Sequence, residues 1–226
     1  ANDPGHRVIS SGFAAPPTGL LVEIKSFVTT PFAENAYLIT DGDEAMVIDP
    51  GEATPELLDA IEGLRVTTLV NTHAHIDHVG GNAEIKTRTG AEFVCHADAR
   101  ETLASVPMQG KMFGMSVAPS PPPDRLIAEG DTLTVGSVTL NIVDVPGHAP
   151  GHIALVGDGF IVSGDVLFAG SIGRTDLFGG DMDQLMESIR TKLLPLPDDT
   201  VVLSGHGPPT TIGQERKSNP FILAEL

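Results

Sequence analysis

The stretch NTHAHIDHVGGN, residues 71–82, places three imidazoles and one carboxylate within six positions of the chain. It continues the apolar run that begins at residue 66, and we predict that 66–72 form a buried strand. Residues two apart on an extended chain share a face, so His73 and His75 at the strand's end can reach one ion. Asp77 and His78 follow at the turn and can reach a second point nearby. The stretch therefore predicts ligands for two adjacent metal ions.

Three more side chains are needed, because a catalytic zinc usually has three protein ligands and an open position. His148, Asp165 and His206 each follow an apolar run and lie beside glycine, which lets backbone approach an ion without a side-chain clash. A lone His or an Asp after Gly is more often a packing or turn residue, so the argument depends on the cluster at 71–82. The predicted sets are His73, His75 and His148 for one ion, and Asp77, His78 and His206 for the other, with Asp165 as a bridge.

Apolar runs separated by Gly and polar turns surround these residues. Strands are expected at 20–28, 36–40, 45–49, 66–72, 91–96, 137–146, 152–157, 159–165 and 200–207. Helices are expected at 54–64, 79–90, 97–106 and 181–194, the first capped by Thr54 and the last by Asp181. Two strand-rich halves with interleaved helices predict an α/β (α+β) fold in which sheets pack together with helices outside.

We expect a Pro/Gly-rich tail at 1–19 and a single domain at 20–226. The segment KMFGMSVAPSPPPDR (111–125) is predicted to be irregular. Whether residues 107–125 form an active-site lid or a surface connection stays open. Met108, Met112, Phe113 and Met115 likewise either pack in the interior or form an apolar wall beside the site.

Composition narrows the class of protein. The net charge of −17, from 13 basic and 30 acidic residues, disfavours binding to nucleic acid or to an anionic membrane. The sequence has no run of about 18 apolar residues, so no membrane span is predicted. Residues 1–19 lack the apolar core of a signal peptide. The single cysteine, Cys95, is expected to be a buried strand thiol, and a reducing cytoplasm fits it. The oligomeric state is not predicted.

The motifs THAHIDH (72–78), PGHAPGH (146–152), SGD (163–165) and SGHGP (204–208) resemble, in order, the metal motifs of the metallo-β-lactamase superfamily. The resemblance spans about residues 20–210. It implies a four-layer αββα sandwich with a binuclear site at the edge of two packed sheets. The seven ligand roles given above carry over, and Asp77 would also orient a metal-bridged hydroxide that attacks the substrate.

Asp at position 165, rather than Cys, is similar to the glyoxalase II group, which implies hydrolysis of a thioester such as S-lactoylglutathione. GSIGRTDLFGGD (170–181) resembles the segment by which these enzymes hold glutathione, and RKSNPF (216–221) is similar to their short, one-domain relatives. Arg174 and Asp176 are the expected substrate-binding residues. Asp176 stands where the group has Tyr, and we expect that these 226 residues do not include the helical domain that completes the glutathione site in the long enzymes.

Two alternatives remain at this point. GRTD (173–176) also resembles the persulfide dioxygenases, which share the fold and use one iron, although SGHGPP here differs from their corresponding segment. The same site could also open a lactone or a β-lactam. Zinc is the preferred metal, with iron or manganese as alternatives, because His and Asp ligands suit all three. The expected partner is a small-molecule thioester.

Overall fold

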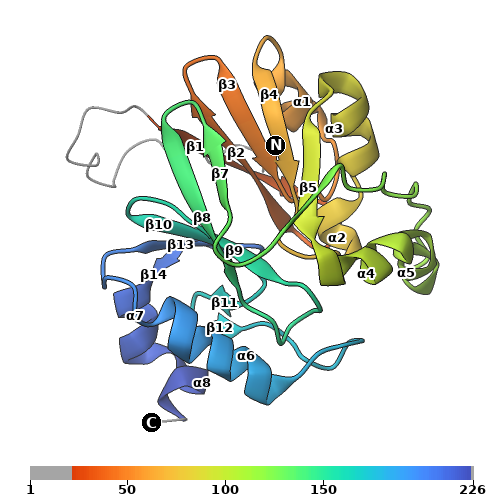
Figure 1. Ribbon diagram of the computed structural model, residues 1–226. Helices are drawn as coiled ribbons and strands as arrows, with labels where there is room; N and C mark the ends of the chain where they lie inside the picture. Colours follow the sequence, from red (N-terminus) through yellow and green to blue (C-terminus); the bar gives the residue numbers. More distant parts are fainter. Residues whose placement is uncertain (1–21, 225–226) are drawn as a thin grey trace, which may run out of the picture.

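The computed structural model describes residues 22–224, so the predicted tail at 1–19 lies outside the described part. Two six-stranded sheets form its centre (Figure 1). The first sheet has the order β1-β2-β3-β4-β5-β6. Its strands are β1 (Glu23–Thr29), β2 (Glu34–Asp41), β3 (Glu44–Ile48), β4 (Arg65–Val70), β5 (Glu92–His96) and β6 (Arg125–Ile127).

The second sheet has the order β14-β13-β10-β9-β8-β7. Its strands are β7 (Thr132–Val135), β8 (Val138–Asp144), β9 (Ile153–Val156), β10 (Phe160–Gly164), β13 (Val201–Ser204) and β14 (Thr210–Thr211). A small hairpin is formed by β11 (Leu167–Phe168) and β12 (Ser171–Ile172).

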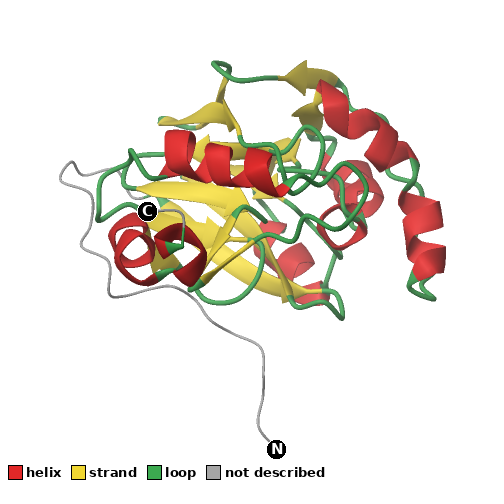
Figure 2. Cartoon of the chain, turned by 90° about the horizontal axis from the view of Figure 1, so that it is seen from below, coloured by secondary structure: helices red, strands yellow, loops and turns green. Residues whose placement is uncertain are grey.

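Helices cover the outer faces of both sheets (Figure 2). Beside the first sheet are α1 (Pro55–Ile61), α2 (Ile76–Val79), α3 (Asn82–Thr89), α4 (Arg100–Ala104) and α5 (Val106–Met112). Beside the second are α6 (Met182–Ser188), its continuation at Ile189–Leu193, α7 (Ile212–Ser218) and α8 (Pro220–Leu223). Within residues 22–224, no helix combines the length and the apolar character needed to cross a membrane.

Three apolar clusters explain this layering. In β2, Ala36 and Leu38 pack toward the helices, whereas Tyr37 and Ile39 pack between the two sheets. This is the two-residue alternation of a strand that is covered on both faces. A third cluster joins the outer face of the second sheet to α6 and its neighbours. The predicted αββα sandwich is therefore confirmed.

Local signals set the helix ends. The Thr54 side chain accepts a hydrogen bond from the Leu57 amide, and Pro55 occupies the first helical position. The Asp181 carboxylate accepts from the Gln184 amide in the same way. Both caps are confirmed; they satisfy donors that a helix N-terminus leaves free.

Several boundaries differ from the sequence prediction. The helix expected at 79–90 begins later, as α3, and a separate short helix, α2, ends before it at Val79. The helix expected at 97–106 is a short 3₁₀ turn followed by α4, and α5 extends into the segment predicted to be irregular. Met108 and Met112 are exposed, so they do not pack in the interior.

Candidate metal centre

The ligand-type side chains come from loops that follow β4, β8, β10 and β13, at one edge where the two sheets meet. Two backbone contacts join the sheets there. Glu34 at the start of β2 pairs with His206 in an isolated bridge, and the Asn35 amide donates to the Gly205 carbonyl. Residues far apart in sequence are thereby brought to a single site.

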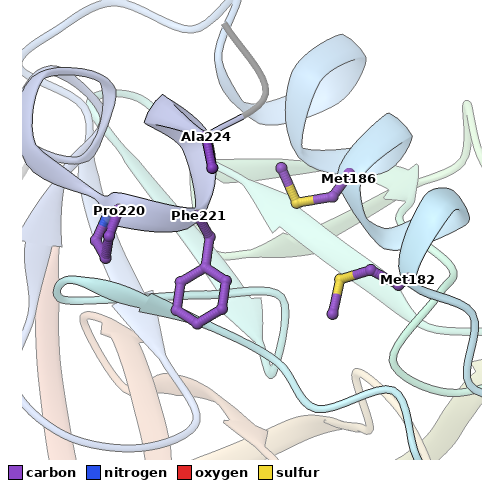
Figure 3. A pocket seen from close by; sticks show the side chains of 5 residues that line it. All are labelled: Met182, Met186, Pro220, Phe221 and Ala224. Carbon is purple, nitrogen blue, oxygen red and sulfur yellow. The ribbon is translucent and has the colours of Figure 1, made fainter.

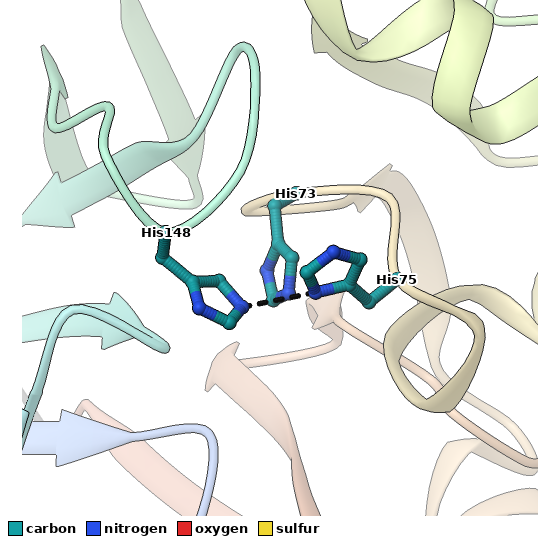
Figure 4. A group of neighbouring side chains, drawn as sticks. All are labelled: His73, His75 and His148. Atoms are coloured by element: carbon teal, nitrogen blue, oxygen red, sulfur yellow. Dashed lines mark hydrogen bonds between the residues drawn. The ribbon is translucent and has the colours of Figure 1, made fainter. Parts of the chain in front are cut away.

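The first set that the structure brings together is His73, His75 and His148 (Figure 4). One ring nitrogen of each lies within 4.8 Å of the others. His75 Nδ1 and His148 Nε2 are only 2.9 Å apart. Three imidazole nitrogens that converge in this way match the ligand type and number of a zinc site.

The second set is Asp77, His78 and His206, again with ligand atoms within 4.8 Å of one another. Asp165 lies between the two sets. Its Oδ2 is 3.7 Å from His148 Nε2 and 3.4 Å from His206 Nε2, and its Oδ1 is 3.4 Å from His78 Nε2. All seven residues predicted as ligands are thus in one place, with the carboxylate between the two groups.

Four of the imidazoles are oriented by hydrogen bonds on the side of the ring that faces away from the cluster. The acceptors are the Thr72 hydroxyl for His73, the Asp49 carboxylate for His78, the Arg174 carbonyl for His148 and the Phe32 carbonyl for His206. Each bond uses Nδ1, at 2.7 to 3.2 Å. Because carbonyls and carboxylates only accept, and the Thr72 hydroxyl already donates to Asp49, Nδ1 carries the proton. Nε2 of each ring is left to point inward, as in proteins that bind a metal through histidine.

The chemistry of the interior fits divalent cations. Among the described residues, His73 Nε2, His78 Nε2 and Asp165 Oδ1 are buried and have no hydrogen-bond partner. A buried polar atom without a partner costs about 1–3 kcal/mol. Three such atoms in one cluster would be a large burden for a site that binds nothing, and a pair of bound cations would satisfy all of them.

Two further acidic residues, Asp49 and Glu34, support this cluster and were not predicted from the sequence. Asp49, in a left-handed conformation at φ 49°, accepts from the Thr72 amide and hydroxyl and from His78 Nδ1. Glu34 is fully buried, accepts from the Thr29 hydroxyl, and has its other oxygen 3.7 Å from His78 Nδ1. Each residue had a sequence feature that could have identified it. Asp49 is a carboxylate at the end of an apolar strand next to β4, and Glu34 is a carboxylate at the start of an otherwise apolar strand.

His152 supports the cluster from behind. Its ring stacks on His73 with centroids 4.6 Å apart, and its Nε2 accepts from the Asp165 amide at 3.1 Å. Among the described residues it belongs to none of the groups of converging ligand atoms, which include a third set of Asp49, His73 and His78. From this position His152 buttresses the loop that carries the ligands.

Burial and the mixed charges set the pKa values of the cluster. Burial lowers the pKa of His73, and burial with His148 nearby lowers that of His75 to about 4. Burial also lowers the pKa of His206, but its contacts with Asp165 and Asp77 outweigh this and raise the pKa to about 10. In the protein alone, protons on the second set therefore compensate the carboxylates. A metal would take over that role, because it binds only the unprotonated nitrogen.

The two predicted substrate-binding residues lie together at the surface. The Arg174 guanidinium makes a two-pronged ion pair with the Asp176 carboxylate, at 2.6 and 2.7 Å. Both side chains are exposed. The Arg174 backbone carbonyl holds His148, so this segment contacts the site through its main chain while its cation is engaged by Asp176.

An apolar pocket of about 340 Å³ lies elsewhere, between α6 and α8 (Figure 3). Its lining residues are Met182, Met186, Pro220, Phe221 and Ala224. It contains no nucleophile, acid or metal ligand. We therefore locate the candidate site at the His/Asp cluster, which has the potential metal ligands and acids, and not at this pocket.

The chain belongs to the metallo-β-lactamase superfamily, whose family model matches residues 29–206. The hydroxyacylglutathione hydrolase GloC of Haemophilus influenzae is 41% identical over 208 residues, covering 89% of this chain and 98% of that one. The hydroxyacylglutathione hydrolase of Rhodospirillum rubrum is 32% identical over 79% of this chain and 77% of its own.

Solved structures agree with this assignment. The BLEG-1 B3 metallo-beta-lactamase superimposes with a TM-score of 0.82 at 37% identity, over 88% of this chain and 99% of that one. TTHA1623 in a di-iron-bound form gives 0.80 at 36% identity, over 87% and 98%. ETHE1 from Myxococcus xanthus gives 0.69 at 27% identity, over 87% and 83%.

Proposed function

We propose that this protein is a binuclear metal-dependent thioesterase of the glyoxalase II type, acting on S-lactoylglutathione or a related acylated thiol. The observation that carries the proposal is the position of Asp165 between two groups of three ligand-type side chains. The relatives named hydroxyacylglutathione hydrolase support the choice of substrate class. The substrate itself is a small molecule, and we place the enzyme in the cytoplasm.

In this proposal His73, His75 and His148 hold one ion, Asp77, His78 and His206 hold the other, and Asp165 contacts both. The similarity to TTHA1623, which was solved in a di-iron-bound form, supports a site for a pair of ions. Zinc is our first choice, with iron or manganese as alternatives. Bound divalent ions would supply Lewis acidity, which acidifies water and polarises a carbonyl oxygen.

The chain's own groups then direct the reaction. The side chain of Asp77 is 15% exposed, so its carboxylate can accept a hydrogen bond from the attacking water and orient it. The water oxygen adds to the thioester carbonyl carbon, the carbon–sulfur bond breaks, and the products are a carboxylate, a thiol and one proton. A thiol pKa near 8.5 makes the thiolate a good leaving group without a dedicated acid.

The test is a comparison of two assays on the same metal-loaded protein. Thiol release from S-lactoylglutathione, without oxygen consumption, is the expected result. Oxygen uptake on glutathione persulfide, with no thiol release from the thioester, would overturn the proposal.

A persulfide dioxygenase that uses one iron is the second candidate. The segment GRTD (173–176) favours it, and ETHE1 is among the similar structures. Lactone or β-lactam opening is a third, which the similarity to the BLEG-1 B3 metallo-beta-lactamase supports. A lactone and a β-lactam therefore belong in the same substrate panel.

A further inference from the structure

Gln109 of α5 connects this helix to the loop that carries His73, His75 and Asp77. Its Oε1 accepts a hydrogen bond from the Ile76 amide at 3.0 Å, and its Nε2 donates to the Ala74 carbonyl at 3.2 Å. Ala74 and Ile76 flank His75. One side-chain amide therefore fixes the main chain on both sides of a proposed ligand.

The first of these bonds replaces a missing cap. α2 begins at Ile76 with His75 in the capping position, and no side-chain cap hydrogen bond is made there by His75. The first amides of a helix need partners from outside it. Gln109 provides one from a different helix. Since an amide N–H can only donate, the Gln109 oxygen must face Ile76, which fixes the orientation of the side chain.

Gln109 is itself held at the junction of α4 and α5. Its Nε2 also donates to the Thr102 carbonyl at 2.9 Å, and the Ser105 hydroxyl oxygen lies 3.2 Å from the same nitrogen. Close packing keeps α5 near the loop, because a Cβ added to Gly110 would lie 3.3 Å from Ile76 Cδ1 and 3.0 Å from the Met115 carbonyl. The carboxamide is thus anchored on one side and contacts the ligand loop on the other.

The same segment reaches the opposite side of the cluster. The Phe113 ring, which follows α5, packs edge-on against Phe32 with centroids 5.3 Å apart. The Phe32 carbonyl accepts from His206 Nδ1. The α5 region therefore contacts the surroundings of both proposed ligand sets, through Gln109 for one and through Phe32 for the other.

We propose that Gln109 is a positioning residue for the metal centre, which sets the main-chain geometry of residues 74–76 and hence the convergence of His73, His75 and Asp77. The inference rests on the metal centre of the proposed function. Partners of this kind, one step behind the ligands, typically change metal affinity 10- to 100-fold when they are removed. A residue that only docks α5 would change stability and leave metal binding as it was.

The experiment is a cobalt titration of metal-free protein, read by the visible absorption of bound Co²⁺ and by its dissociation constant. Gln109→Ala removes both loop contacts, and Gln109→Met removes the hydrogen bonds while it keeps the bulk. Gln109→Glu retains an acceptor for Ile76 but no donor for Ala74. Lys111→Ala is the matched control, because Lys111 is an exposed residue of the same helix.

We expect about 10- to 100-fold weaker cobalt binding and an altered spectrum for Gln109→Ala and Gln109→Met, an intermediate effect for Gln109→Glu, and wild-type behaviour for Lys111→Ala. Hydrogen exchange at the Ile76 amide should accelerate in the first two variants. Wild-type affinity and spectrum in a folded Gln109→Met protein would overturn the inference. Wild-type protein that binds cobalt but hydrolyses no thioester would overturn the proposed function alone, and wild-type protein that binds no cobalt would overturn both.

Discussion

Asn71 and Asn82, the first and last residues of NTHAHIDHVGGN, hydrogen-bond to each other through both side-chain amides, at 2.6 and 3.3 Å. Asn71 also donates to the His78 carbonyl. The ligand-bearing stretch is therefore closed into a loop by its own ends. Both residues are buried, so neither amide has water as a ready substitute partner.

Breaking this pair should weaken the metal-free fold. For Asn71→Ala we predict that the free energy of unfolding falls by about 1–3 kcal/mol, because the buried Asn82 amide loses both hydrogen bonds with Asn71 and keeps only the one to the Ser120 hydroxyl. Denaturant unfolding in the presence of a chelator measures this. Asn141→Ala, at an exposed position of β8, should change the value by at most about 0.5 kcal/mol. Equal losses in the two variants would contradict the role of the pair.

Gly205 should tolerate no side chain. A Cβ at this position would overlap Asp165 Oδ1 and lie 2.7 Å from His78 Cε1. We predict that Gly205→Ala loses most of its bound metal, as measured by elemental analysis of the purified protein. Gly207→Ala is the control in the same loop, since a Cβ there meets nothing within 4 Å. It carries only the cost of a positive φ, on the order of 1 kcal/mol. Similar metal loss in both would contradict the steric explanation.

Arg174 should contribute to the binding of a charged substrate and not to the metal. For Arg174→Ala we predict that KM rises about 10-fold for an anionic thioester and changes little for a neutral one, as expected for loss of one charge-assisted hydrogen bond. Metal content should be unchanged, because the backbone carbonyl that holds His148 remains.

Asp176→Asn is the matched variant, because it weakens the ion pair that engages Arg174. We predict a lower KM for the anionic thioester. Steady-state kinetics on both substrates distinguish the outcomes: equal KM effects on the charged and neutral thioesters would indicate that Arg174 is structural.

Cys95 should be inert in the folded protein. Burial raises its pKa from 9.0 to about 11, and its side chain is almost fully inaccessible. At neutral pH the thiolate fraction, which is the reactive form, falls about 100-fold from the pKa change alone. We predict at least that retardation of labelling by a thiol reagent relative to unfolded protein.

The raised pKa of Cys95 also sets how this thiol makes the stability of the fold depend on pH. The folded state keeps the proton, so its contribution to stability is complete below the unfolded pKa near 9 and is lost as pH rises toward 11. Labelling of native protein should therefore remain slow up to about pH 9. Rapid labelling at pH 7 without unfolding would contradict the buried assignment.

The sequence predicted those features that depend on neighbouring residues in the chain. Apolar runs bounded by turn residues placed β2 to β5 and the layers, and the spacing of His73, His75, Asp77 and His78 predicted a common cluster that the structure assembles. The Thr54 and Asp181 caps were also readable, because a cap is a local feature.

What the sequence did not predict depends on contacts between distant segments. Asp49 supports His78 only because β3 lies next to β4. Gln109 meets residues 74–76 across 33 and 35 positions of chain. Neither residue stands in a recognisable motif. Almost all of α5 was missed, because the expected helix ended at 106 and the prolines at 121–123 suggested irregular structure from 111 onward.

The central claim is that seven side chains hold two metal ions, and that Asp165, one of the seven, is shared by both ions. Elemental analysis of metal per chain, in wild-type protein and in Asp165→Ala reconstituted with excess zinc and then desalted, tests it most directly. We predict two ions per chain in the wild type and at most one in Asp165→Ala, with thioester hydrolysis lost in parallel. A single ion per wild-type chain, unchanged in Asp165→Ala, would contradict the account.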